Sequence, residues 1–341
     1  MMFETIKELC RIDGVSGREQ AVSSEIIRRA EPLADLVETD NLGNVIAFKK
    51  GAAVPKNRLM LAAHMDEVGM IITSIDEDGL LHFDTVGGVN SKVIAGRRVK
   101  IGENGVAGVV GVKPVHLLEA EEKGTAVPVN ELTIDIGADS REQACEVVSL
   151  GDAAYFWGDY LEFGDGFLTA KALDDRAGCA ILLEIMKEDL PFDTYFVFTV
   201  QEEIGARGAK AAAYTVNPDI AIVVETTASG DVSGVEGEKR VARVGGGAVV
   251  TYMDHGTIYD RELYQRAFAL AAEEGIPCQT KTMIAGGNDS GEISVSRGGV
   301  RTVAVSVPCR YLHSPANMAK KSDVEAVYRL SRALTHTLGD I

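Results

Sequence analysis

Hydrophobic residues follow two kinds of pattern along this chain. Apolar positions three and four residues apart are typical of amphipathic helices. Together with one apolar and one Ala-rich stretch, they predict helices at 3–11, 19–33, 179–186, 205–213, 261–274 and 322–338. Continuous runs of β-branched and other apolar residues predict buried strands at 45–48, 59–66, 195–198, 219–225, 280–284 and 300–307. Strands and helices in this alternation favour an α/β fold, with a mixed, mostly parallel sheet flanked by helices.

The middle of the chain, residues 68–164, has a different pattern. Short β-rich runs alternate there with turns of Gly, Asn and Asp, and only 141–147 favours a helix. The runs are 70–75, 80–83, 97–101, 106–112, 132–136 and 153–157. Evenly spaced short strands predict a small β-barrel or sandwich. We therefore expect two domains, an α/β domain from residues 1–67 and 165–341 and an inserted β-barrel from residues 68–164.

Composition and charge restrict the classes of partner. The 341 residues carry a formal net charge of −17, which argues against nucleic acid and anionic membranes, because phosphate groups attract Lys and Arg. No apolar run approaches the roughly 20 residues that span a bilayer, and acidic residues come too early for a signal peptide. The five cysteines include no Cys-x-x-Cys pair, which indicates reduced thiols and a cytoplasmic location.

Potential metal ligands and proton carriers stand where the apolar strands end. His64 and Asp66 end one strand, and side-chain alternation places them on the same face. Glu202 and Glu203 follow the strand at 195–198. Each pair is ordinary when taken alone, since adjacent glutamates usually face water and His-x-Asp sequences are mostly structural.

Other parts of the chain add ligands of the same kind. Glu225 ends a third strand, and His313 lies in the loop after a fourth. A helix start adds Asp174 and Asp175, a pair that simple N-capping explains equally well. The carboxyl ends of parallel strands meet at one edge of a sheet, so we expect these side chains to converge. Two histidines with several carboxylates suit zinc, cobalt or manganese. The acids exceed the needs of one tetrahedral ion, whereas two ions about 3.5–4 Å apart with a bridging carboxylate would use them.

Four motifs in a fixed order resemble those of a known family. They are His64-Met65-Asp66-Glu67-Val68-Gly69, Ala172-Leu173-Asp174-Asp175-Arg176-Ala177-Gly178, Val200-Gln201-Glu202-Glu203-Ile204-Gly205-Ala206-Arg207-Gly208-Ala209 and Arg310-Tyr311-Leu312-His313-Ser314-Pro315. The segments 14–17 and 286–289 also fit. With these motifs the chain resembles the M42 family of dinuclear metallo-aminopeptidases over nearly its whole length. The resemblance implies a zinc-peptidase-like α/β fold.

The resemblance also implies a metal-binding role for each matched residue. His64 ligates one ion, His313 ligates the other, and Asp174 bridges both. Glu203 is a further ligand, and so is Glu225, which stands where the family usually has Asp. The longer side chain places this carboxylate about 1.5 Å further from the backbone. The resemblance implies two divalent ions per chain, zinc or cobalt first and manganese second.

The chemistry follows from the same resemblance. Glu202 is the general base for a metal-bridged water, and Asp66 assists catalysis by orienting His64. The substrates would be short peptides with a free N-terminus, from which N-terminal residues are removed. The inserted β-domain would serve assembly into a homo-oligomer, up to a tetrahedral dodecamer built from dimers.

Three other interpretations are open at this point. An M20- or M28-like deacylase or carboxypeptidase would cleave N-acetylated peptides and leave free-amine peptides intact. An endoglucanase, a label that some family members carry, would need two carboxylates that do not ligate metal. A non-catalytic assembly or binding protein is motivated only by Glu225, and the retention of Glu202 argues against it.

Overall fold

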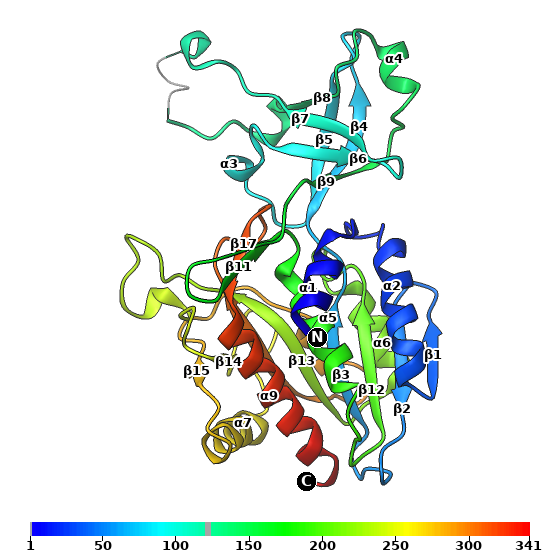
Figure 1. The fold of residues 1–341 in the computed structure, drawn as a ribbon, viewed down its shortest axis with the longest axis vertical. Coiled ribbons are helices and arrows are strands. Elements are labelled where there is room, and N and C mark those ends of the chain that lie inside the picture. The colour runs from blue at the N-terminus through cyan, green and yellow to red at the C-terminus, as the bar shows by residue number, and fades with distance from the viewer. Residues whose placement is uncertain (1, 120–123) are drawn as a thin grey trace.

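The larger part of the protein is a helix-covered sheet. The computed structural model describes residues 2–119 and 124–341. Within them, eight strands form a mixed sheet in the order β1-β2-β12-β3-β13-β16-β14-β15 (Figure 1). Their bounds are β1 (Leu36–Thr39), β2 (Val45–Lys49), β3 (Leu59–His64), β12 (Thr194–Thr199), β13 (Ile220–Ala228), β14 (Ala248–Val250), β15 (Cys278–Thr280) and β16 (Arg301–Cys309). The neighbours β12, β3, β13 and β16 run parallel, so their carboxyl ends meet at one edge.

Helices cover both faces of this sheet. One face packs on α1 (Met2–Arg11), α2 (Gln20–Ala30), α5 (Leu173–Ile185), α7 (Arg261–Glu273) and α9 (Lys321–Thr337). The other face packs on α6 (Arg207–Val216) and α8 (Ser290–Ser294). In β3, Leu59 and Leu61 belong to the first core, and Met60 and Ala62 belong to the second. A strand buried on both faces has a continuous apolar sequence, which is the pattern that predicted it.

A second group of strands closes into a barrel in the order β4-β5-β8-β7-β6-β9, at the upper end of Figure 1. The bounds are β4 (Gly69–Ile75), β5 (Leu81–Val86), β6 (Arg98–Ile101), β7 (Val106–Val110), β8 (Thr133–Asp135) and β9 (Ala153–Phe156). The helices α3 (Ser91–Ile94) and α4 (Arg141–Cys145) belong to the same part of the chain. The barrel has a hydrophobic core of its own, which includes Met70, Leu81, Ile101 and Ile134.

A small third sheet connects two loops that matter for the site. It consists of β10 (Leu161–Phe163), β11 (Phe167–Ala170) and β17 (Asn317–Lys320). Ala170 of β11 pairs with Asn317 of β17. This pairing holds the start of α5 beside the loop that carries His313.

The predicted α/β fold with an inserted β-barrel is confirmed, and the differences concern element ends and short elements. The helix expected at 19–33 ends at Ala30, because Pro32 lacks an N–H and a 3-10 turn follows. The helix expected at 179–186 begins earlier in the structure, because α5 starts at Leu173 with a kink at Asp174 and Asp175 and is regular only after them. The short elements β1, β10, β11, β17, α3 and α8 escaped prediction because a few residues carry too little periodicity. No helix among the described residues is long and apolar enough to cross a bilayer.

Candidate metal and active site

The candidate metal ligands and the candidate base named from the sequence lie at the carboxyl edge of the parallel strands. His64 is the last residue of β3, Glu225 lies in β13, and Glu202 and Glu203 lie in the loop after β12. They line a cavity of about 450 Å³ together with His313, from the loop after β16, and Asp174, from the start of α5. Residues from five separate elements therefore meet in one place, as the strand-end argument predicted.

Two groups of potential ligands share one residue. In the first, Nε2 of His64 lies 3.2 Å from Oδ1 of Asp174 and 3.5 Å from Oε1 of Glu225. In the second, Nε2 of His313 lies 3.6 Å from Oδ2 of Asp174 and 3.4 Å from Oε2 of Glu203. The ligand atoms of each group lie within 4.8 Å of one another. Asp174 thus turns one oxygen toward each group, and nitrogen and oxygen donors of this kind fit two borderline divalent ions.

Both histidine rings are oriented by hydrogen bonds on their far side. Nδ1 of His64 lies 3.2 Å from the backbone oxygen of Asp66, and Nδ1 of His313 lies 2.9 Å from the backbone oxygen of Gly88. A carbonyl oxygen can only accept, so Nδ1 carries the hydrogen in this arrangement. The lone pair of Nε2 then faces the carboxylates, as metal-ligating histidines require.

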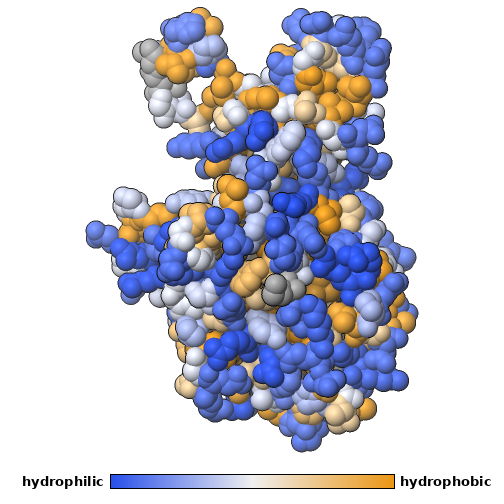
Figure 2. All heavy atoms as spheres, in the orientation of Figure 1, coloured by the Kyte–Doolittle hydropathy of each residue, from blue (hydrophilic) through white to orange (hydrophobic). Residues whose placement is uncertain are grey.

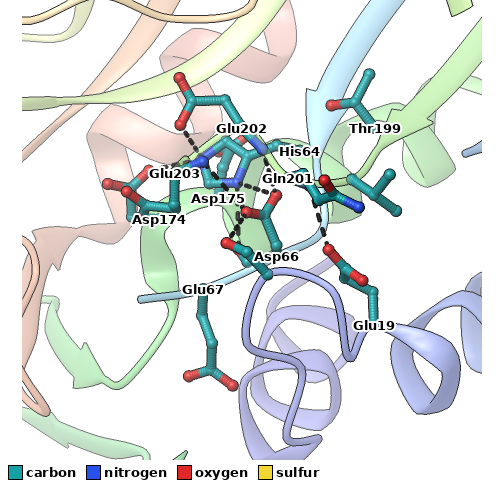
Figure 3. A network of polar contacts seen from close by, with 12 residues as sticks. Glu19, His64, Asp66, Glu67, Asp174, Asp175, Thr199, Gln201, Glu202 and Glu203 are labelled. Atoms are coloured by element: carbon teal, nitrogen blue, oxygen red, sulfur yellow. Dashed lines mark hydrogen bonds and ion pairs between the residues drawn. The ribbon is translucent and has the colours of Figure 1, made fainter. Parts of the chain in front are cut away.

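Asp66 is the buried side chain that holds this edge together (Figure 3). Its carboxylate lies 3.4 Å from Nδ1 of His64 and accepts hydrogen bonds from the backbone N–H groups of Glu202 and Glu203 at 3.0 and 3.2 Å. The hydroxyl of Ser16 donates to it at 2.6 Å. Burial alone would raise the pKa of Asp66, but these contacts outweigh burial and lower it.

The loop that carries the two glutamates has an unusual backbone. The φ angle of Gln201 is 57°, a left-handed backbone conformation that residues other than glycine rarely adopt. The backbone N–H of Gln201 donates to Glu19 at 3.2 Å, and Asp66 binds the next two N–H groups. The loop is therefore fixed by two buried carboxylates, and it places Glu202 and Glu203 on different sides of the site.

The two glutamates meet different neighbours. Glu203 belongs to the His313 group, whereas Glu202 belongs to neither group of potential ligands. An oxygen of Glu202 lies 4.0 Å from Nε2 of His64, and the side chain lines the same cavity. Glu202 thus lies near His64 of the first group, shares the cavity with both groups and belongs to neither.

The site holds far more negative than positive charge. Burial raises the pKa of Glu202 and of Glu203 well above the usual range, and neighbouring carboxylates add to the effect. Burial also raises the pKa of Glu225 to about 7. Asp174 differs, because its contacts with the histidines outweigh burial and lower its pKa to about 2. In the absence of cations the edge therefore retains protons, and divalent cations would take their place.

Asp175 does not join the site. Its carboxylate is fully buried, and Oδ1 accepts a hydrogen bond from the backbone N–H of Gly178 at 2.9 Å. The two neighbouring aspartates therefore differ in role. For Asp175 the capping explanation holds, whereas Asp174 turns into the cavity.

Several supporting residues had no role in the sequence-based assignment. Asp289 is fully buried and accepts a hydrogen bond from the hydroxyl of Thr199, the last residue of β12. Asn44 accepts from the N–H of Val200 and donates to the carbonyl of Gly208, both at 2.9 Å. Only Asp289 had a signal in the sequence, because it is the last residue of the segment 286–289 that fits the family.

Comparison with known proteins identifies the family of this chain. The profile of a family described as M42 glutamyl aminopeptidase matches residues 43–330. A putative aminopeptidase of Acetivibrio thermocellus is 41% identical, over 96% of this chain and 97% of the relative. A lysyl aminopeptidase of Pyrococcus furiosus is 33% identical, over 98% of this chain and 97% of the relative. The structure of the TET1 peptidase of Pyrococcus horikoshii, which can assemble into a tetrahedron or a large octahedral shell, is similar with a TM-score of 0.88 and 34% identity. It covers 99% of this chain and 100% of that chain.

Gly88 provides a test of how the barrel supports the site. A Cβ at this position would lie 3.3 Å from Nδ1 of His313, which is tight enough to push the ring away from the Gly88 carbonyl. We expect Gly88→Ala to weaken the binding of one of two divalent ions by about 10-fold, the lower end for loss of a ligand-orienting contact. Titration calorimetry of metal-free protein with zinc measures both affinities. Gly111→Ala, where a Cβ meets only ordinary contacts, is the control. Unchanged binding of both ions in Gly88→Ala would contradict this role.

The raised pKa values predict how the metal-free protein responds to pH. A carboxyl whose pKa rises on folding binds protons that the unfolded chain releases, so stability falls as pH rises between the two values. For Glu225 this window runs from 4.5 to about 7, and for Asp289 from 3.8 to about 6. Burial lowers the pKa of His64, but Glu225 and Asp174 raise it well above 6.5, so its contribution to stability is lost only above pH 6.5.

We therefore expect the melting temperature of chelator-treated protein to fall as the pH rises from about 5 to 7. The same scan with zinc present should be flatter, because the cation replaces the protons. High salt in both scans suppresses the effect of the net surface charge. A melting temperature of the metal-free protein that rises over this range would show that the carboxylates are ionised without a cation.

Proposed function

Because the chain belongs to the M42 glutamyl aminopeptidase family, we propose that it is a dinuclear metal-dependent aminopeptidase that removes N-terminal residues from short peptides. One observation carries the proposal. Two His–carboxylate groups share Asp174, and a further carboxylate, Glu202, shares their cavity but belongs to neither. This is the arrangement that two-ion hydrolysis with a separate base requires.

The proposed ligand sets follow the two groups. His64, Asp174 and Glu225 would hold one divalent ion, and Asp174, Glu203 and His313 would hold the other. Zinc or cobalt suits these nitrogen and oxygen donors best, with manganese as the alternative. Bound ions would polarise the peptide carbonyl and lower the pKa of water.

Glu225 keeps its ligand role in this proposal although the family usually has Asp at the position. One oxygen of its carboxylate accepts a hydrogen bond from the backbone N–H of the next residue, Thr226, at 2.9 Å. The same oxygen lies 3.5 Å from Nε2 of His64. The longer side chain therefore folds back on its own backbone, which keeps the carboxylate within the first group.

Glu202 is the proposed general base. It would take a proton from the attacking water and return it to the leaving amine, a role that needs a carboxylate not committed to a metal. Burial and neighbouring acids raise its pKa, which moves the group toward the working pH of such a base. Asp66 acts indirectly. It contacts His64 and the backbone of the glutamate loop, and it does not line the cavity. We assign it as a positioning residue.

The names of the relatives do not fix the preferred N-terminal residue. The family is described by glutamyl substrates, whereas the Pyrococcus furiosus relative is a lysyl aminopeptidase. The preference of this chain must therefore come from residues of its own cavity.

We also propose that the inserted segment 68–164 is an assembly domain and that the chain forms a homo-oligomer. The TET1 relative assembles into large particles. Figure 2 shows hydrophobic residues at the surface of the barrel end of the molecule. In this segment Val109, Val112, Val115, Leu117 and Leu150 are exposed large hydrophobic residues. Apolar side chains gathered on a surface favour contact with another protein.

The general base and the ligand can be separated by two variants. Glu202→Gln keeps the shape but cannot accept a proton, so kcat for an aminoacyl-p-nitroanilide should fall by about 10²–10⁴-fold with wild-type metal content. Glu203→Gln should lose one ion per chain, measured by elemental analysis. An N-acetylated substrate, which should not be cleaved, separates an aminopeptidase from a deacylase. Full activity after chelation, or metal loss in Glu202→Gln with none in Glu203→Gln, would contradict the proposal.

The assembly role can be tested with surface charges. Val115 and Leu117 are 72% and 55% exposed in the inserted segment. The double variant Val115→Asp with Leu117→Asp should sediment as a smaller species than wild type, because charges disrupt an apolar interface. Val295→Asp is the control, since Val295 is 70% exposed outside the insert. A double variant that keeps the wild-type sedimentation coefficient would argue that this surface takes no part in assembly.

A further inference from the structure

The cavity contains a charged side chain that the proposed chemistry does not use. Beyond the ligand groups it extends along the ends of β13 and β16 to the chain that follows β14 and β15. Lys281 is the first residue after β15, and it is the single lysine or arginine among the described residues that line the cavity. The backbone N–H of Lys281 donates to Val250 at the end of β14, which fixes the base of the side chain.

The ammonium group of Lys281 is buried and only partly satisfied. The residue is 8% exposed. Nζ donates one hydrogen bond, to the backbone oxygen of Ala285 at 2.6 Å, although an ammonium group has three donors. Within the described part of the chain it forms no ion pair. Burial lowers the pKa of Lys281, which reflects this incomplete compensation.

The nearest carboxylates are not available as partners. Asp254 accepts hydrogen bonds from the backbone N–H groups of Gly256 and Thr257, and from the hydroxyl of Tyr259. Glu225 belongs to the first ligand group. The charge of Lys281 is therefore directed at the cavity without a dedicated counter-ion in the protein.

The surrounding wall suits a polar ligand. Thr226, Thr227, Thr251 and Ser306 line the same cavity, so its wall carries hydroxyl groups besides Lys281 and the ligand groups. A buried ammonium group without a counter-ion is costly, and a carboxylate that enters the cavity would reduce this cost. A side chain that reached Lys281 would belong to the residue whose peptide bond lies at the ligand groups.

We propose that Lys281 determines substrate specificity, by binding the side-chain carboxylate of an N-terminal Glu or Asp. This inference rests on the proposed aminopeptidase function and names its substrate class. The bond from Nζ to Ala285 gives Lys281 a second role, because it also holds the loop at 285–288 that borders the cavity. The test must therefore distinguish recognition of charge from support of the loop.

A matched pair of substrates makes this distinction. Glutamyl- and glutaminyl-p-nitroanilide have nearly the same shape and differ in charge. We expect wild-type protein with zinc or cobalt to prefer the glutamyl substrate in kcat/KM. Lys281→Gln should reduce the ratio of the two kcat/KM values by about 10- to 100-fold, the range for a lost hydrogen bond to a charged group. Lys281→Arg should retain most of the preference, and Lys281→Glu should favour lysyl-p-nitroanilide instead.

Two controls complete the experiment. Lys210→Gln makes the same charge change on α6, outside the cavity, and should leave the ratio unchanged. Calorimetric binding of L-glutamate and L-glutamine to wild type and Lys281→Gln gives a readout without turnover. The specificity role is wrong if Lys281→Gln lowers kcat/KM equally for the glutamyl and glutaminyl substrates. It is also wrong if wild type prefers glutaminyl or lysyl substrates. In both cases the aminopeptidase function stands. If wild type cleaves no aminoacyl substrate, both are wrong.

Discussion

The structure depends on keeping several carboxylates buried at one edge of a sheet. Like charges at this distance repel one another, and burial adds a further cost to each ionised group. Asp66 is stabilised within the protein, because a hydroxyl and two backbone N–H groups donate to it. Asp174, Glu203 and Glu225 have no comparable set of donors, and they gather around two histidine nitrogens. The fold thus satisfies Asp66 with hydrogen bonds, whereas cations would be needed to balance the other three.

The sheet topology explains how several carboxylates that repel one another are held in one place. Four parallel strands deliver their carboxyl ends to the same edge, and apolar residues buried on both faces hold those strands in position. The inserted barrel is part of this arrangement, because the carbonyl of Gly88 fixes the ring of His313. A segment with its own hydrophobic core therefore contributes a contact to the site. Any movement of the barrel relative to the sheet would change the orientation of one potential ligand.

Much of this was predictable from the sequence, and the remainder has physical reasons for being hidden. Continuous apolar runs predicted the strands, and polar residues at their ends predicted His64, Glu202, Glu203 and Glu225, because strand direction alone places such residues together. The donors to Asp66 were not predictable, since backbone N–H groups have no sequence signature. Gly88 and Asp289 act through contacts with residues far away in the chain, which no local pattern encodes. Asp174 and Asp175 are neighbours of the same type, and only the backbone path decides which one enters the cavity.

The charge balance of the cavity changes when cations bind, and this bears on the substrate. Asp174, Glu202, Glu203 and Glu225 line the cavity, and their four negative charges equal the charge of two divalent ions. Burial lowers the pKa of Lys281, and Asp254 and Glu225 offset part of this effect in the metal-free protein. Two bound divalent ions would neutralise the cavity acids as a group, and Lys281 would then lose the compensation from Glu225. Occupation of the two ligand groups would therefore strengthen the attraction of Lys281 for an anionic side chain. Under the proposed function, metal binding and substrate selection would thus be coupled through electrostatics, without any change in the positions of the residues.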